Sequence, residues 1–149
     1  MEDTNNESSN ILDIENKALS ALQKCKIAYK NYKKAYMTYF RFVESGVKTV
    51  EMVGDNLTSS NVNVVKKVVA QSKTLSGFMK TLEIKFDKAY NEFISLDRNS
   101  ISISVVRKVD HIYDEMNDAK ESFNSEINKI LVYNDFLEHG KDLDNLEKT

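Results

Sequence analysis

The chain contains no proline and no tryptophan, only four glycines and a single cysteine. The absence of proline favours long uninterrupted helices, because proline removes a backbone hydrogen bond and clashes with the preceding turn. The single cysteine, Cys25, cannot form an intramolecular disulfide bond, which excludes a disulfide framework and fits a reducing compartment. No stretch approaches the roughly 18 consecutive apolar residues of a membrane-spanning helix. The acidic N-terminal stretch resembles neither a secretory signal nor a transit peptide.

Residues that would indicate catalysis or metal binding are also scarce. The histidines, His111 and His139, have no neighbouring nucleophile, and the isolated glycines form no phosphate-binding loop. His111 and Glu115 are four residues apart and could share a metal ion, but no second pair completes a site. An exposed ion pair is the simpler interpretation. We therefore expect no enzyme activity, no metal site and no cofactor.

What the chain does have is the composition of one soluble, helix-rich domain. Of its 149 residues, 41% are hydrophobic and 30% are charged, which is sufficient for a buried core. Large apolar side chains are missing from the first residues. We expect a disordered acidic leader at residues 1–10, one helical domain at residues 11–140 and a polar tail at residues 141–149.

Apolar residues recur at steps of three and four, which places them on one face of a helix. This pattern predicts helices near residues 11–53, 60–97 and 103–139. The middle segment has an a/d heptad seam typical of a left-handed supercoil. Its members are Val65, Val68, Ser72, Leu75, Met79, Leu82, Phe86, Ala89, Phe93 and Leu96.

Three breaks define the ends of these helices. Gly54 is expected to end the first helix and Gly140 the last. Across residues 97–100 the heptad phase fails, so the chain must kink or stop there, and the alternating residues 101–105 are interpreted as the entry to the last helix. The predicted fold is all-α, either a long antiparallel helical hairpin or a three-helix bundle. It is expected to be coiled-coil-like and dimeric, because a helix of about forty residues spans roughly 60 Å and would leave its apolar seam uncovered.

Charge is segregated along the chain behind a net value of −2. Residues 1–16 hold five acids and no base, residues 17–108 hold 17 bases against 7 acids, and residues 109–149 hold 4 bases against 11 acids. Such asymmetry indicates either an anionic partner or attraction between the chain's own helices.

The basic residues fall on helix faces away from the apolar seams. In the first helix these are Lys26, Lys30, Lys33, Lys34, Arg41 and Lys48; in the second, Lys66, Lys73 and Lys80 repeat every seven residues beside Lys67 and Lys88. Tyr29, Tyr32, Tyr36 and Tyr39 lie on the first seam, where aromatic side chains are expected to fill the core.

The run KCKIAYKNYKKAYMTYFRFVESGVKTV resembles the first long helix of BAR domains, especially those of Arf GTPase-activating proteins and inverse-BAR modules. The likeness continues at residues 82–89 and, after a break, at residues 106–108. The resemblance implies a crescent-shaped homodimer that grips anionic lipid through Lys30, Lys33, Lys34, Arg41, Arg107 and Lys108. Two departures are plain: the family's kink proline is missing, and the residues after about 131 are too few for a further long helix.

Together these features favour a peripheral membrane-binding dimeric module, cytoplasmic and located at membrane surfaces, that senses or shapes curvature. The predicted membrane-binding residues are Lys26, Lys30, Lys33, Lys34, Arg41, Lys66, Lys73, Lys80, Arg107 and Lys108. The alternative hypothesis is a non-catalytic adaptor or complex subunit whose coiled-coil seam packs against helices of partner proteins. Nucleic-acid binding ranks below both, because no recognition motif accompanies the basic faces.

Overall fold

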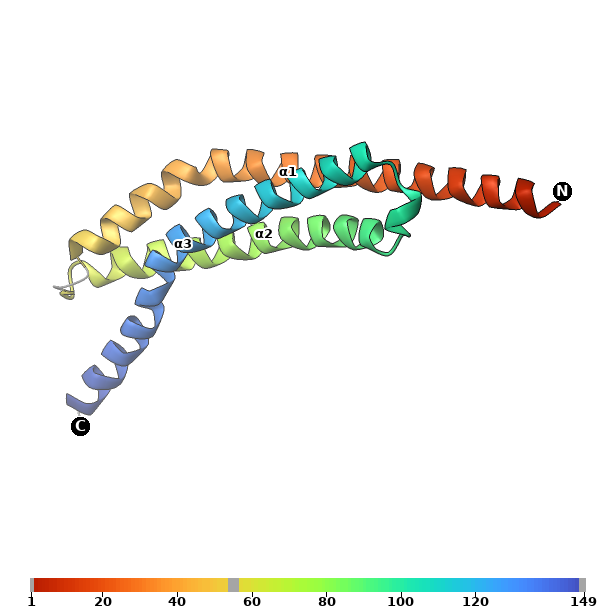
Figure 1. Ribbon diagram of the computed structural model, residues 1–149. Coiled ribbons are helices and arrows are strands. Elements are labelled where there is room, and N and C mark those ends of the chain that lie inside the picture. The colour runs from red at the N-terminus through yellow and green to blue at the C-terminus, as the bar shows by residue number, and fades with distance from the viewer. Residues whose placement is uncertain (1, 54–56, 148–149) are drawn as a thin grey trace. The chain divides into compact units, whose positions relative to one another are not determined.

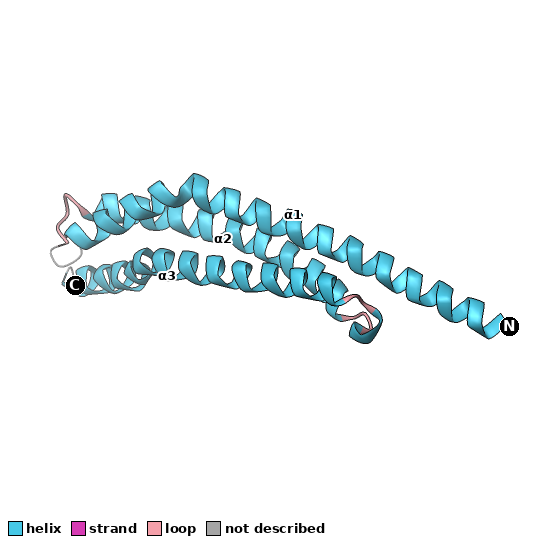
Figure 2. Ribbon diagram, turned by 45° about the horizontal axis from the view of Figure 1, so that its top comes forward, coloured by secondary structure: helices cyan, strands magenta, loops and turns pink. Residues whose placement is uncertain are grey.

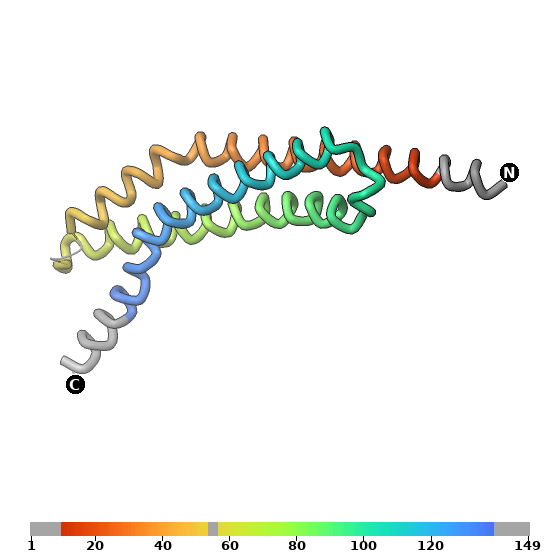
Figure 3. Tube along the Cα trace, in the orientation of Figure 1, coloured from red at the N-terminus to blue at the C-terminus, as the bar shows by residue number. Residues whose placement is uncertain are grey.

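The computed structural model describes the backbone of residues 2–53 and 57–147 and the side chains of residues 10–53 and 57–138 (Figure 3). Within this part the chain is all-helical, without a strand, as Figure 2 shows. Helix α1 spans Glu2–Val53, α2 spans Val62–Ile94 and α3 spans Ile103–Glu147 (Figure 1). The prediction of an all-α fold with three helices is confirmed.

A short loop, and not a kink, separates α2 from α3. It contains a 3₁₀ turn, η1, at Arg98–Ser100. The carboxylate of Asp97 caps this turn by accepting hydrogen bonds from the Asn99 backbone N–H and the Ser100 hydroxyl, both at 3.1 Å. These bonds satisfy backbone and side-chain donors that a continuous helix would have used otherwise. The choice left open by the sequence is thereby decided in favour of two helices.

The outer ends of α1 and α3 extend further than the apolar repeat predicted. Helix α1 already begins at Glu2, and α3 continues past Gly140 to Glu147, so the predicted start near residue 11 and the predicted stop at Gly140 are corrected. An apolar repeat marks where a helix packs, not where its hydrogen bonding ends. One glycine costs a helix only about 1 kcal/mol relative to alanine, too little to stop it. The other predicted stop, at Gly54, lies outside the described residues.

The chain forms two compact units, each built from segments of all three helices. Unit 1 comprises Met1–Lys34 and Lys80–Lys120, and unit 2 comprises Ala35–Met79 and Glu121–Thr149. In unit 1, α2 runs antiparallel to α3: Tyr90 stacks on Tyr113 with ring centroids 4.3 Å apart, and Glu83 pairs with Lys120 at 3.3 Å. Each unit is therefore a three-helix bundle with its own core.

Unit 1 has a core to which all three helices contribute. Tyr32 from α1 and Phe86 from α2 are each only 1% exposed, and Met116 from α3 is fully buried. The other buried apolar residues are Ala18, Ala21, Leu22, Cys25, Ala89, Phe93, Ile101, Val105, Val109 and Ile112. Outside the core, the Glu15 carboxylate of α1 accepts a hydrogen bond from the Ser102 N–H at the start of α3, at 3.2 Å.

Unit 2 is packed tightly around Gly46. A Cβ atom built on Gly46 would lie 2.9 Å from Ile130 Cδ1 of α3 and 3.1 Å from Val68 Cγ1 of α2, so only glycine fits without a shift. Tyr36 packs edge-on against Phe123 with centroids 6.0 Å apart. The buried apolar residues are Val43, Val47, Val50, Val65, Val69, Leu75, Met79, Phe123, Ile127, Ile130 and Leu137.

The heptad seam of α2 is covered from within the chain. Seven of its ten predicted members are buried, namely Val65, Ser72, Leu75, Met79, Phe86, Ala89 and Phe93, and the other three are half-buried. The α2 seam therefore needs no second chain to cover it. The expected dimer rested on the longer first helix and stays a prediction from the sequence. One aromatic expectation is also corrected: Tyr39 is 40% exposed, because it lies at the edge of the packing between α1 and α2.

Candidate functional site

The most distinctive charge feature of the chain is an acid-free part of α1. From Asn16 to Val43 the sequence holds seven Lys or Arg residues and no Asp or Glu. Carboxylates within one helix usually neutralise lysines at i+3 or i+4. Between these two residues no acid is available within the helix, so only lysines near the ends of the segment, such as Lys17 with Asp13, can be neutralised by α1 itself.

Within unit 1, this basic segment presents one continuous exposed line of side chains. Leu12, Leu19, Lys26, Lys30 and Lys33 follow one another at steps of seven, seven, four and three residues, and all five are exposed. Such steps keep side chains on one side of a helix. We call this line the α1 lysine face. Lys34 is also exposed and lies one position further around the helix.

The lysines of this face differ from the other α1 lysines of unit 1 in their partners. Lys17 pairs with Asp13 at 3.1 Å and Lys24 pairs with Glu92 of α2 at 2.9 Å. Among the described side chains, Lys26 and Lys30 form no ion pair. The Lys33 ammonium lies 6.0 Å from the centroid of the Tyr29 ring, a cation–π distance. The α1 lysine face is therefore positive, and no described carboxylate forms an ion pair with its lysines.

Tyr29 connects this region of α1 to the acidic helix α3. Burial raises the pKa of the Tyr29 hydroxyl, and the Glu115 carboxylate, to which that hydroxyl donates a hydrogen bond, raises the pKa further. Glu115 in turn lies 3.0 Å from His111 Nε2. Glu115 of α3 thus interacts with Tyr29 and His111, and the lysines of the α1 lysine face stay exposed.

The structure gathers some of the predicted membrane-binding residues and separates others. Lys26, Lys30, Lys33 and Lys34 share the exposed side of α1 in unit 1. Arg107 and Lys108 are exposed on α3, and Lys80 of α2 pairs with Glu83 at 3.4 Å. The remaining three predicted residues, Arg41, Lys66 and Lys73, are exposed in unit 2.

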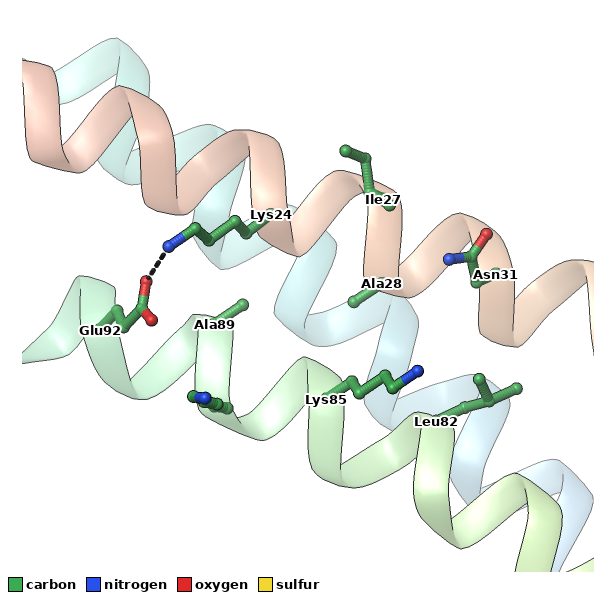
Figure 4. A pocket seen from close by; sticks show the side chains of 9 residues that line it. Lys24, Ile27, Ala28, Asn31, Leu82, Lys85, Ala89 and Glu92 are labelled. Carbon is green, nitrogen blue, oxygen red and sulfur yellow. Dashed lines mark hydrogen bonds and ion pairs between the residues drawn. The ribbon is translucent and has the colours of Figure 1, made fainter.

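A second feature of unit 1, not expected from the sequence, is an open groove between α1 and α2 (Figure 4). Its volume is about 320 Å³. We call it the α1–α2 groove. Its lining residues are Lys24, Ile27, Ala28 and Asn31 from α1 and Leu82, Lys85, Lys88, Ala89 and Glu92 from α2. Three of these are lysines that the predicted set of binding residues lacks.

Small side chains explain why the groove is open. In Figure 4, Ala28 and Ala89 point toward one another from the two helices, and neither is large enough to fill the space between them. The Lys24–Glu92 ion pair bridges the helices at one end. The sequence predicted that these helices pack together, but not the register that places Ala28 opposite Ala89.

The cysteine and the possible metal ligands of the sequence form no site among the described side chains. Cys25 is fully buried, and burial raises the pKa of its thiol from 9.0 to about 11, with a further contribution from Glu92. The thiol is thus kept protonated, which makes it a poor nucleophile. Among the side chains that the structure describes, no three His, Cys, Asp or Glu residues gather as a metal site would require. His139 lies outside those side chains.

Comparisons with known proteins give no relative: no family model, no curated protein and no solved structure matches the chain. Across the described residues, no helix has the length and apolarity needed to span a membrane.

Proposed function

We propose that this protein is a non-catalytic, peripheral membrane-binding module that attaches to anionic lipid through the α1 lysine face. The observation that carries the proposal is a line of exposed lysines that have no carboxylate partner among the described side chains. Two exposed leucines precede them on the same side of the helix. Basic residues attract an anionic leaflet, and leucines enter the region between headgroups and acyl chains. With this face toward the lipid, α1 would lie along the membrane surface.

The expected strength follows from the number of lysines. Each Lys close to an anionic surface contributes about 1 kcal/mol, so Lys26, Lys30 and Lys33 together contribute about 3 kcal/mol. Partial burial of Leu12 and Leu19 adds to this, because burying a leucine completely contributes roughly 1.5–3 kcal/mol. Binding of this strength is reversible, and salt weakens it because the Debye length falls to about 3 Å at 1 M.

Liposome co-sedimentation tests the proposal. The parent protein should bind vesicles that contain phosphatidylserine and should not bind pure phosphatidylcholine vesicles. The variant Lys26→Glu/Lys30→Glu/Lys33→Glu should lose binding while circular dichroism shows unchanged helicity. Equal binding of the variant and the parent, or equal binding of the parent to both kinds of vesicle, would refute the proposal.

Two controls separate a specific face from overall charge. Lys26→Arg/Lys30→Arg/Lys33→Arg preserves the charge and should retain binding. Lys17→Glu/Lys48→Glu/Lys129→Glu changes the net charge by the same amount as the first variant, but at exposed lysines that already pair with Asp13, Glu44 and Glu126. It should also retain binding. Loss of binding in this control would mean that only net charge matters.

The homodimer, the BAR-like crescent and curvature sensing or shaping stay predictions from the sequence, as does the cytoplasmic location. The alternative function, an adaptor that binds helices of partner proteins, now has a different basis, because the α2 seam is covered. In unit 2, Tyr39 and Phe78 form an edge-on aromatic pair at 6.2 Å that is 40% and 46% exposed. Such pairs are common at protein interfaces.

A further inference from the structure

The α1–α2 groove combines an apolar interior with unpaired positive charge. Ile27, Ala28, Leu82 and Ala89 supply the apolar surface, and Ile27 is 50% exposed to solvent. Small-molecule sites in proteins are mostly apolar, with a few polar groups that orient the ligand, and occupy about 300–1,000 Å³. At about 320 Å³ the groove lies at the lower end of that range. It therefore has room for one short apolar chain and not for a large ligand.

Two of the lysines that line the groove have no ion-pair partner among the described side chains. Lys85 and Lys88 are one helical turn apart on α2, both are exposed, and neither forms an ion pair within the described part of the chain. In Figure 4 the side chain of Lys85 runs toward the end of the groove at which Asn31 and Leu82 lie. Lys24 is different, because Glu92 already neutralises it at 2.9 Å. The free positive charge of the groove thus comes from α2.

We infer that the α1–α2 groove binds a single anionic lipid that has one acyl chain and a phosphate headgroup. The ammonium groups of Lys85 and Lys88 would pair with the phosphate. Two lysines are needed because a phosphate carries more negative charge than one lysine neutralises. The acyl chain would cover the apolar interior between Ala28 and Ala89. This site shares no side chain with the α1 lysine face, and binding of a dissolved lipid does not require a membrane surface.

Isothermal titration calorimetry with the 149-residue chain tests the inference. The probe is lysophosphatidic acid with a ten-carbon chain, kept below its micelle-forming concentration. One lysophosphatidic acid molecule should bind per protein chain. Lysophosphatidylcholine with the same chain should bind at least tenfold more weakly, because its headgroup has no net negative charge. Glycerol 3-phosphate, which has the headgroup and no chain, should also bind at least tenfold more weakly.

Two variants address the two parts of the site separately. Lys85→Glu/Lys88→Glu removes the headgroup contacts and should weaken lysophosphatidic acid binding at least tenfold. Ala28→Phe fills the groove without a change of charge and should have an effect of similar size. Lys85→Gln/Lys88→Gln provides a second, less disruptive charge variant. Helicity and thermal midpoint are measured for each variant, and a folded variant with the parent's affinity overturns the inference.

Control variants keep this result distinct from the membrane proposal. Lys17→Glu/Lys129→Glu matches the charge change outside the groove and should bind lysophosphatidic acid as the parent does. Lys26→Glu/Lys30→Glu/Lys33→Glu should also keep full affinity for the dissolved lipid, although it is expected to lose vesicle binding. Equal binding of the three ligands, or equal weakening by the groove variants and the controls, would overturn the groove as a lipid site and leave the membrane proposal standing.

Discussion

In the two units, side chains of different size lie between α1 and α2. In unit 1, Ala28 and Ala89 face each other and leave a groove with lysines around it. In unit 2, Tyr39 and Phe78 meet edge-on at the boundary of the same two helices. Both helices pass through the two units without a break, so the same pair of helices presents both arrangements. The small side chains of unit 1 leave a groove at this boundary, whereas the large ones of unit 2 place an exposed aromatic pair there.

The largest effect should come from the core of unit 1. Tyr32 is 1% exposed, so Tyr32→Ala should lower the free energy of unfolding by about 3–5 kcal/mol. Urea denaturation followed by circular dichroism measures the change. A loss below about 1 kcal/mol would mean that the core of unit 1 is loosely packed. The groove would then not be a fixed feature that distinguishes unit 1 from unit 2.

A smaller effect is expected at the tightest contact in unit 2. Gly46→Ala puts a methyl group 2.9 Å from Ile130 Cδ1, so it should destabilise the protein by about 1–2 kcal/mol, since overpacking outweighs the better helix propensity of alanine. Ile130→Val removes that Cδ1 atom. In the Ile130→Val background Gly46→Ala should cost much less, and a double-mutant cycle measures the coupling. Additive effects of the two substitutions would contradict the contact.

Opening the aromatic surface of unit 2 should cost about 1 kcal/mol. Tyr39→Ala removes an edge-on ring contact, but Tyr39 is already 40% exposed, so little buried area is lost. The same denaturation experiment checks this value. A cost as large as that of Tyr32→Ala would show that Tyr39 belongs to the core, as the sequence predicted, and that the two units differ less than their side chains indicate.

A small effect of the opposite sign is expected at a glycine of α2. Gly77 lies within α2 of unit 2, and a Cβ atom built there meets nothing within 4 Å. Gly77→Ala should therefore raise the free energy of unfolding by slightly under 1 kcal/mol, because alanine favours the helix without a clash. The thermal midpoint should rise by a few degrees. A decrease would indicate a packed surface where the structure has open space.

The buried hydroxyl of Ser72 offers a related test on the same helix. Ser72 is fully buried in the α2 seam of unit 2, and its Oγ atom has no hydrogen-bond partner among the described groups. An unpaired buried hydroxyl costs about 1–3 kcal/mol, so Ser72→Ala should leave stability unchanged or raise it by up to about 1 kcal/mol. Destabilisation in the denaturation experiment would reveal a partner for this hydroxyl.

Most of the fold followed from periodicity, because apolar spacing and breakers act locally along the chain. The repeat in α2 identified its buried side, and the failure of the heptad phase at Asp97 identified the loop before α3. The exposure of Lys26 and Lys30 followed from the same spacing. The ends of α1 and α3 did not follow, since no strong stop signal exists where an uninterrupted polar helix simply continues.

The α1–α2 groove was beyond prediction for a physical reason. Its nine lining residues are close together only because residues 24–31 of α1 pack against residues 82–92 of α2. Such a register depends on the complete core, including α3, and not on either segment alone. In the sequence, Lys88 was one of the basic residues of the second helix and Ala89 a member of its seam, but nothing placed either of them beside Ala28 of the first helix.

The single buried thiol of unit 1 also provides a built-in kinetic reporter. Cys25 is fully buried, and its pKa of about 11 keeps it protonated at neutral pH. A thiol reagent such as dithionitrobenzoate can therefore react only when the helices around residue 25 separate for a moment. The rate of labelling therefore measures how often the helices separate, as amide hydrogen exchange does for backbone groups. Because Cys25 contributes to the core of unit 1, the time course of labelling would show how long that core stays closed between openings. It would also show whether a bound ligand lengthens this time. No probe has to be introduced.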